Sequence, residues 1–166
     1  HFAGYWKDVG TISSLWEANM EVLDPEHSGI DIFDENWKIY SRNSGMTGHK
    51  IGSNAVVENS MITDGCRIDG SIKHSILFSG VRVEKGAKIE DAVVMGKTVI
   101  KAGAVVEHCI VAENVVIGEN AVVGSMPKGE EHGVATIGSG ITIGKGAKIG
   151  PNAMVNKNVE DGEEQW

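Results

Sequence analysis

The chain has 166 residues, with 23 acidic and 15 basic side chains and a formal net charge of −8 at pH 7. Nonspecific nucleic-acid binding needs clustered Lys and Arg, and the basic residues here are scattered, so that function is not expected. No apolar run reaches the roughly 18 residues that cross a bilayer, and no signal peptide is visible. We therefore expect a cytoplasmic protein with neither membrane nor nucleic-acid partners.

The first forty residues differ in composition from the rest, because seven of the nine aromatic residues precede residue 41. The chain opens on apolar side chains with nothing before them to pack on, which indicates part of a larger protein. Ser14 and Glu17 fit a capping box, so we predict a helix after Ser14 that ends before Pro25. This helix is apolar enough to need a partner surface, which we expect to lie outside this chain.

From residue 51 to 159 an aliphatic residue returns at every sixth position. One run is Val93, Val99, Val105, Val111, Ile117 and Val123, and the other is Ile137, Ile143, Ile149 and Val155. A helix repeats near 3.6 residues and a strand at 2, so a period of six indicates short strands separated by corners. Small residues follow four positions later: Ala55, Ala87, Cys109, Ala121, Ala147 and Ala153.

We interpret this pattern as a triangular parallel β-helix with three six-residue repeats per coil and coils about 4.8 Å apart. A helical alternative would place many glycines inside helices, at a cost of about 1 kcal/mol each. Phase slips between residues 68 and 83 and between 89 and 93 predict bulged corners. Residues 125–133 interrupt the repeat and are expected to loop out. Cys66 and Cys109 occupy small-residue positions and are predicted to be buried thiols.

Histidines are the candidate general bases, because a neutral imidazole can take a proton from an acceptor hydroxyl. The candidates are His49, His74, His108 and His132. His108 is expected to face outward if Cys109 faces inward. For each of them a solvated or locally bonded side chain is the alternative. The sequence Gly144-Lys145-Gly146 lacks the Ser or Thr and the spacing of a phosphate-binding P-loop, so we assign its glycines to the repeats.

The order of Ile or Val, then Gly, then a small residue resembles the hexapeptide repeats of left-handed β-helix proteins. The handedness is implied by this resemblance and not by the pattern, since most parallel crossovers are right-handed. That superfamily contains acyltransferases and the carboxy-terminal domains of several sugar nucleotidyltransferases.

A second resemblance is more specific. Residues 4–11 (GYWKDVGT) and 14–20 (SLWEANM) are similar to the last catalytic-domain block of bacterial glucose-1-phosphate adenylyltransferase, also called ADP-glucose pyrophosphorylase. Residues 30–40 resemble the segment by which that enzyme passes into its β-helix, and the similarity continues at 59–62, 65–68 and 74–78. The fold implied is a mainly β, left-handed parallel β-helix, preceded by a short helical remnant of an α/β nucleotidyltransferase domain.

The resemblance implies a metal role for Asp8, as one of the carboxylates that hold Mg²⁺ at the reacting phosphates. The nucleotide loop, the second metal-binding acid and the sugar-phosphate lysine of the family have no counterpart here. No complete catalytic site is therefore expected, and the chain alone is predicted to be inactive. The resemblance also implies a homo- or heterotetramer that anionic sugar phosphates regulate at the junction between domains. Five basic residues are candidates for such a site, with scattered surface charge as the favoured alternative: Arg67, Lys73, Arg82, Lys85 and Lys88.

We thus expect a nucleotidyltransferase remnant at 1–29, a connecting segment at 30–50, the β-helix at 51–159 and an acidic tail at 160–166. The resemblance implies that the whole enzyme joins ATP and glucose 1-phosphate into ADP-glucose and pyrophosphate for glycogen synthesis. Two alternatives stay open: a stand-alone hexapeptide-repeat acyltransferase that uses acetyl-CoA and a His base, and a non-catalytic structural subunit.

Overall fold

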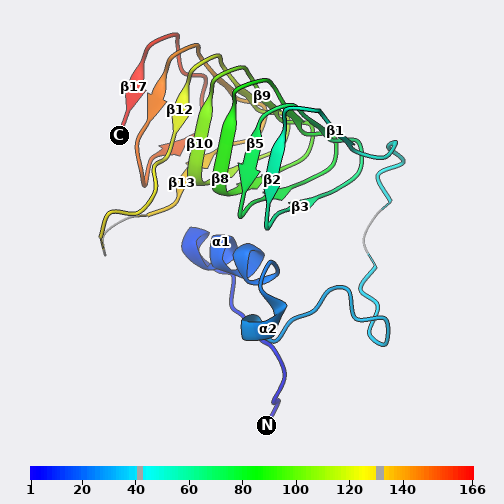
Figure 1. Cartoon of the computed structure of the whole chain (residues 1–166). Helices are drawn as coiled ribbons and strands as arrows, with labels where there is room; N and C mark the ends of the chain where they lie inside the picture. The colour runs from blue at the N-terminus through cyan, green and yellow to red at the C-terminus, as the bar shows by residue number, and fades with distance from the viewer. Residues whose placement is uncertain (41–42, 130–132) are drawn as a thin grey trace.

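The structure, a computed structural model, describes residues 1–40, 43–129 and 133–166. Its main body is a parallel β-helix of about seven turns, which runs from β1 at one end to β17 at the other (Figure 1). The predicted fold class is confirmed: the protein is mainly β with few helices, and its winding is consistent with a left-handed β-helix.

The strands form three faces of a prism. The first face contains β1 (Lys50–Ile51), β4 (Arg67–Ile68), β7 (Arg82–Val83), β9 (Val99–Ile100), β11 (Val116–Ile117) and β14 (Thr142–Ile143). The second contains β2 (Val56–Glu58), β5 (Ser71–Lys73), the first halves of β8 (Lys88–Val94) and β10 (Val105–Val111), β12 (Val122–Val123), β15 (Lys148–Ile149) and β17 (Glu164–Gln165). The third contains β3 (Met61–Ile62), β6 (Ile76–Leu77), the second halves of β8 and β10, β13 (Ala135–Ile137) and β16 (Met154–Val155).

Aliphatic side chains fill the interior of the prism. The second repeat run lies wholly inside it, since Ile137, Ile143, Ile149 and Val155 are at most 4% exposed. The small residues predicted beside them are also buried, except for the half-buried Ala55. Burial of each large aliphatic side chain contributes about 1.5–3 kcal/mol, so this dry column is the main source of stability.

The first repeat run changes sides halfway along. Its second half, from Val111 onward, faces the interior as predicted. Val99 and Val105 point outward instead, because Ile100 and Val106 occupy the interior positions of those strands. The prediction that side chains six apart stack inside is therefore wrong for the first half of this run.

The break arises at the corner between the second and third faces. Interior residues on either side of it are five positions apart, as with Val106 and Val111, so most coils take 17 residues instead of three six-residue repeats. One residue with positive φ makes this corner in four successive coils: Asn59, His74, Asp91 and His108, with φ between 35° and 53°. Asn, Asp and His adopt this left-handed conformation more readily than most residues.

The amino-terminal helix α1 (Ile12–Glu21) begins earlier than predicted. Thr11 is its N-cap: the Ser14 N–H donates to the Thr11 hydroxyl at 3.1 Å, and the Thr11 N–H donates to the Ser14 hydroxyl at 3.0 Å. Ser14 is thus the third residue of the helix, and the predicted Ser14–Glu17 capping box is wrong. After α1 ends, Pro25 opens the short helix α2 (Pro25–Ser28), where a missing N–H costs little.

The partner surface of α1 lies within this chain, which corrects the expectation that it lies outside. The helix packs along the third face of the solenoid, below β8 and β10 (Figure 1). The outward residues Ile76, Val93 and Ile110 are at most 4% exposed and form a second hydrophobic cluster with Met20. The third face therefore carries an apolar stripe that α1 covers.

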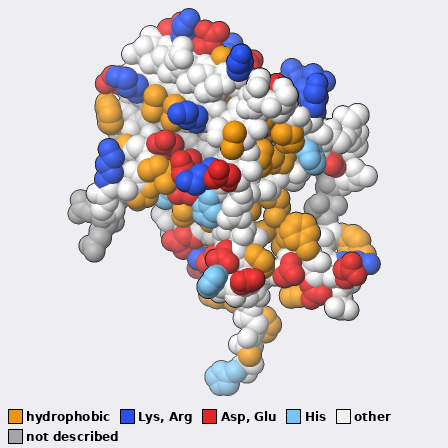
Figure 2. Space-filling view, viewed as in Figure 1, with side chains coloured by type: hydrophobic (Ala, Val, Ile, Leu, Met, Phe, Trp, Pro, Cys, Tyr) orange, Lys and Arg blue, Asp and Glu red, His pale blue; other side chains and the backbone are white. Residues whose placement is uncertain are grey.

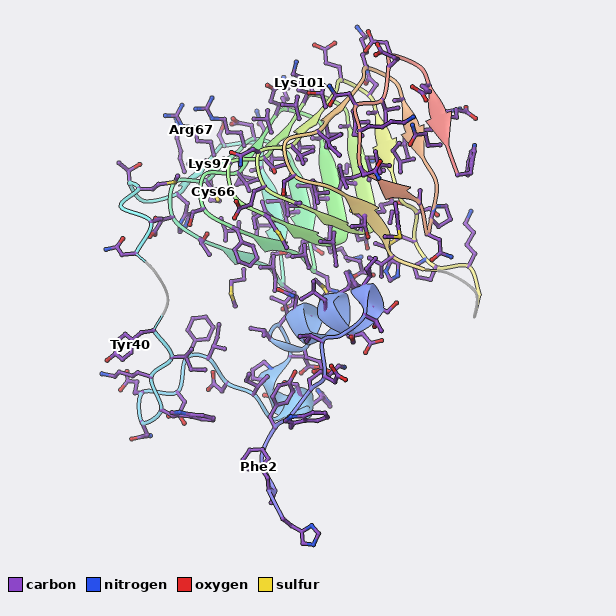
Figure 3. The ribbon with its side chains drawn as sticks, turned by 180° about the vertical axis from the view of Figure 1, so that it is seen from behind. Phe2, Tyr40, Cys66, Arg67, Lys97 and Lys101 are labelled. Atoms are coloured by element: carbon purple, nitrogen blue, oxygen red, sulfur yellow. The ribbon has the colours of Figure 1, made fainter. Side chains whose placement is uncertain are left out.

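Aromatic side chains outside α1 join neither cluster. Of those in residues 1–40, five are 71–85% exposed: Phe2, Trp6, Phe33, Trp37 and Tyr40. Figure 3 shows Phe2 and Tyr40 well away from the solenoid, and Figure 2 shows hydrophobic and acidic side chains mixed over this lower part of the molecule. The segments that flank α1 and α2 thus present much apolar surface.

The predicted interruption at residues 125–133 lies between β12 and β13. Its described part contains no strand, which agrees with a loop, while residues 130–132 lie outside the described part of the chain. The segment predicted as an acidic tail includes β17, which pairs with β15 in the last coil. Neither helix in the described ranges has the length and apolar character needed to cross a membrane.

Candidate functional site at the junction of helix and solenoid

The segment before α1 is extended and is tied to the helix by Tyr5 and Lys7. The Lys7 ammonium donates to Glu21 at 2.7 Å and to Glu17 at 2.9 Å, and the Tyr5 hydroxyl donates to Glu21 at 2.6 Å. Hydrogen bonds from Lys7 and then from Tyr5 lower the pKa of Glu21, and the same carboxylates raise the pKa of Lys7. These charged contacts place Asp8 at the entrance to α1.

Asp8 is exposed, and its Oδ1 accepts a hydrogen bond from the Gly10 N–H at 2.9 Å. Within residues 1–40, 43–129 and 133–166, no three His, Cys, Asp or Glu side chains gather to hold a metal ion. Mg²⁺ requires several oxygen ligands in near-octahedral geometry, so Asp8 by itself does not make a Mg²⁺ site. The metal role of Asp8 stays a prediction, and such a site needs ligands that these ranges do not supply.

A column of His74, Asp91 and His108 occupies the same corner of three successive coils. The Nδ1 atom of His74 lies 2.5 Å from Oδ1 of Asp91, and the side chains are 35% and 20% exposed. A carboxylate bonded to one ring nitrogen orients the imidazole and leaves Nε2 to exchange a proton. His74 and Asp91 therefore have the geometry of a general base with its orienting acid.

Trp16 of α1 closes this column at one end. Its Nε1–H donates to the Asp91 carbonyl oxygen at 2.7 Å, and its ring centroid lies 4.5 Å from that of His108, with the planes at 58°. His108 leaves the prism, as predicted, but it is 7% exposed because the helix covers it. It is therefore sheltered from any substrate in solution, which leaves His74 as the accessible imidazole of the column.

The structure brings together two of the four candidate histidines. His49 is exposed just before β1 and is not part of the column. His132 lies outside the described residues. The general-base role of His74 stays a prediction, and its bond to Asp91 was not expected from the sequence.

The basic residues suggested for an anion site do not converge. Arg67 and Arg82 are direct neighbours on the first face, whereas Lys73 lies on the second face and pairs with Glu90 at 2.8 Å. Figure 3 labels Arg67, Lys97 and Lys101 on the side of the solenoid away from α1, where Lys97 precedes β9 and Lys101 follows it. The geometry therefore does not support one anion site built from all five residues.

An open hollow of about 450 Å³ lies at the corner between the third and first faces. Its lining includes Phe78, Lys97 and Glu113, with Met46 at one side, and Phe78 is 41% exposed. An apolar ring beside two opposite charges suits a small polar molecule. None of its lining residues is His74 or Asp91, so the hollow and the column are separate features.

Cys66 and Cys109 are buried and unpaired to each other, as predicted. Burial raises the pKa of both thiols, because desolvation disfavours the thiolate. Neither sulfur is therefore a reactive nucleophile in the folded protein.

Sequence reasoning missed Asp91 and Trp16 as members of this site. Asp91 lies 17 residues after His74 and 17 before His108, which is the length of one coil. A search at the coil length instead of the six-residue period would have found the column. Nothing in the sequence places Trp16 beside it, because that contact joins residues 75 positions apart.

The parallel coils, their buried aliphatic and small residues, and the helix laid along one face define a hexapeptide-repeat β-solenoid protein. The family model described as GlmU-like, C-terminal hexapeptide, matches residues 44–144, and the chain belongs to this family.

Among solved structures, the chain is similar to the acetyltransferase domain of PglB from Neisseria gonorrhoeae, with 19% sequence identity and a TM-score of 0.50. The match covers 72% of this chain and 54% of that one, so this chain spans about half the length of that structure. At this identity the similarity shows the fold alone.

Proposed function

We propose that this chain is the β-helix region of a sugar-1-phosphate nucleotidyltransferase of the glucose-1-phosphate adenylyltransferase type. The whole enzyme would make ADP-glucose and pyrophosphate from ATP and glucose 1-phosphate, and this region would supply surfaces for assembly and regulation. The observation that carries the proposal is the packing of α1: the helix that directly follows the GYWKDVGT segment of residues 4–11 is packed on the apolar stripe of the solenoid. The motif and the repeats thus belong to one packed body.

Further support comes from the exposed aromatic residues around α1. Five aromatic side chains at 71–85% exposure on a segment of forty residues are unusual for a surface that faces only water. A catalytic domain whose last elements are these residues would cover them. Within that enzyme, Lys7 and Tyr5 would hold the motif against α1, and Asp8 would provide one of several carboxylates for Mg²⁺.

The test of this proposal is Asp8→Asn in the protein that contains this chain together with the residues preceding His1. Because the amide cannot replace a charged oxygen ligand, we expect Mg²⁺-dependent ADP-glucose synthesis to fall at least about 100-fold. The rate is measured as pyrophosphate release over a range of Mg²⁺ concentrations. Higher Mg²⁺ should restore part of it.

A matched control is Asp31→Asn, because the Asp31 side chain is also exposed and also accepts a backbone N–H two residues later, at 2.8 Å from Phe33. This variant should retain the wild-type rate. An Asp8→Asn enzyme as active as the control at every Mg²⁺ concentration would show that Asp8 is not a ligand, and absence of ADP-glucose synthesis by the wild type would refute the whole proposal.

An acetyltransferase is the second candidate, and the comparisons support it at least as well, because the solved structure is named as an acetyltransferase domain and neither comparison names an adenylyltransferase. The observation in its favour is the His74–Asp91 pair. In such a reaction Nε2 of His74 would take the proton of an acceptor hydroxyl or amine. The acceptor would attack the acetyl-CoA thioester carbonyl, and the released thiolate would take up a proton.

Titration of acetyl-CoA into the 166-residue chain separates the two candidates. The first candidate predicts no saturable binding, measured by calorimetry, and no acetyl transfer to sugar hydroxyl or amine acceptors. If acetyl-CoA binds and transfer is lost in His74→Ala but kept in the exposed His49→Ala control, the acetyltransferase assignment is correct. Loss of transfer in Asp91→Asn would then identify the orienting carboxylate.

A further inference from the structure

The hollow at the corner between the third and first faces contains charged groups without partners. Lys97 and Glu113 both line it, and neither side chain makes a hydrogen bond or an ion pair within the described part of the chain. The Asn114 amide beside them makes none there either. One cation and one anion therefore face the same hollow without neutralising each other. This feature belongs to the β-helix alone, whichever proposed function is correct.

Lys97 turns this corner in a backbone conformation that lysine rarely adopts. Successive coils turn here at residues of positive φ, and the N–H of each one donates to a carbonyl of the coil before it. Four of these corner residues are Gly65, Gly80, Asn114 and Gly140, and the fifth is Lys97, with φ of 60°. Glycine and asparagine tolerate the left-handed conformation, whereas a lysine there is strained. Strained residues of this kind are concentrated at binding and catalytic sites.

The hollow is deep because one coil has no side chain at its floor. The residues that precede the corner positions form a second row, in which Ser79, Gly96 and Glu113 follow one another in successive coils. Gly96 leaves a gap between Ser79 and Glu113, which stand two coils or about 10 Å apart. A Cβ atom at Gly96 would lie 3.1 Å from the Ser79 carbonyl oxygen, so even alanine would crowd this floor. The space of about 450 Å³ above it admits a small organic molecule.

Phe78 and Met46 give the hollow an apolar wall. Phe78 is 41% exposed, and no other large apolar side chain is exposed in the described part of residues 58–153. Met46 comes from the segment that enters the first coil, and its side chain lies against Gly65 and Gly80. An aromatic ring beside a thioether suits an apolar or aromatic group of a ligand. The hollow thus combines an apolar wall with two opposite charges.

The two charges decide which class of ligand fits. A simple anion would be attracted by Lys97 but repelled by Glu113 in the next coil, and a simple cation would meet the reverse. A neutral sugar would desolvate both charges without neutralising either. A zwitterion neutralises both at once, and a free α-amino acid carries its ammonium and carboxylate on a single carbon atom. The charges and the apolar wall are therefore complementary to an amino acid with an apolar side chain.

We propose that this hollow binds a free α-amino acid with an apolar or aromatic side chain. The Lys97 ammonium donates to the ligand carboxylate, the ligand ammonium donates to the Glu113 carboxylate, and the ligand side chain packs against Phe78. Glycine or asparagine would make the corner at position 97 without strain but would supply no cation, which gives the strained lysine a reason. The site lies on the side of the solenoid away from α1 (Figure 3), apart from the His74–Asp91 pair.

The test is titration of L-phenylalanine into the isotope-labelled 166-residue chain, followed by amide chemical shifts. We expect saturable shifts at residues 78–80, 96–97 and 113–114. The dissociation constant should be on the order of 1 mM, because the ligand has only about twelve non-hydrogen atoms and the hollow is open. Phenylpropanoate lacks the ammonium and phenethylamine lacks the carboxylate, so each should bind at least about tenfold more weakly. Glucose and inorganic phosphate should give no saturable shifts.

Replacing Lys97 by Gly separates ligand binding from a structural role. Glycine makes the corner without strain, so Lys97→Gly should unfold at the same or a higher urea concentration than the wild type. It should nevertheless bind L-phenylalanine at least about tenfold more weakly, and so should Glu113→Gln. Lys101→Gly is the matched control, because Lys101 is an exposed lysine on the same side of the solenoid and does not line the hollow. This variant should bind as the wild type does.

Several results would overturn the proposal. Absence of saturable shifts with L-phenylalanine would show that the hollow does not bind this class of ligand. Phenylpropanoate or phosphate binding as tightly as the amino acid would identify a general anion site, and tighter binding of glucose would identify a carbohydrate site. Equal binding by Lys97→Gly and Lys101→Gly would show that the strained lysine does not contact the ligand. Circular dichroism confirms that each variant is folded, and Glu113→Gln tests the site independently of the corner.

Discussion

Replacing Val111 by Asn is expected to destabilise the β-helix by about 3–5 kcal/mol, whereas the same replacement of Val105 should cost less than about 1 kcal/mol. Both valines lie in β10 and belong to the same six-residue run. Val111 is fully buried in the aliphatic interior, where an Asn amide finds no partner, so the change loses apolar burial and also leaves polar groups unsatisfied. Val105 faces outward, where an amide remains hydrated.

The measurement is urea unfolding of both variants, followed by circular dichroism in the strand region. Each variant serves as the control for the other, because strand, residue type and substitution are identical. Equal losses would show that both side chains are interior and that the six-residue period continues through the corner at His108. The more stable Val105 variant should also keep the wild-type dependence of the free energy of unfolding on urea concentration.

Replacing Trp16 by Ala is expected to release α1 from the solenoid, with a loss of about 3 kcal/mol in the free energy that holds the helix in place. The indole stacks on His108 and donates to the Asp91 carbonyl, and it packs against the cluster that contains Met20 and Ile110. The interior column of the β-helix does not include Trp16, so the coils should remain folded. The expected result is faster thermolysin cleavage within α1, whose Leu15 and Met20 sites are unchanged, and unchanged strand-region circular dichroism.

Two substitutions separate packing from hydrogen bonding. Trp6→Ala is the matched control, because Trp6 is 76% exposed and should leave the cleavage rate of α1 as it is in the wild type. Trp16→Phe retains an aromatic ring and loses only the Nε1–H donor, so it should cost about 1 kcal/mol. If Trp16→Ala behaves like the Trp6 control, the helix is not held on the solenoid by this contact.

The repeats predicted the fold class because a β-helix is specified locally. Each coil needs the same inward aliphatic and small residues. The six-residue spacing alone therefore predicts the burial of Ile137, Ile143 and Ile149. The prediction failed where the corner geometry changes. A corner made by one residue of positive φ, such as His108, shortens the step to five and turns Val105 outward. Three six-residue repeats would make a coil of 18 residues, whereas most coils here have 17.

The candidate site was harder to predict from the sequence than the fold. His74 and His108 were chosen for their residue type, but Asp91 was not, since only stacking of successive coils puts it beside His74. The helix was predicted, yet its partner was sought outside the chain, because the stripe of Ile76, Val93 and Ile110 is spread over three coils and is interrupted in sequence by interior residues.

The sequence alone determined that the protein is a parallel β-helix with an aliphatic interior, buried thiols and an amino-terminal helix. These features depend on contacts between residues one step or one coil apart, and such contacts repeat and so leave a period. Only the tertiary structure decided which residues of the first run face outward and that α1 lies across the third face. Each of these depends on a single, unrepeated contact, which no period records.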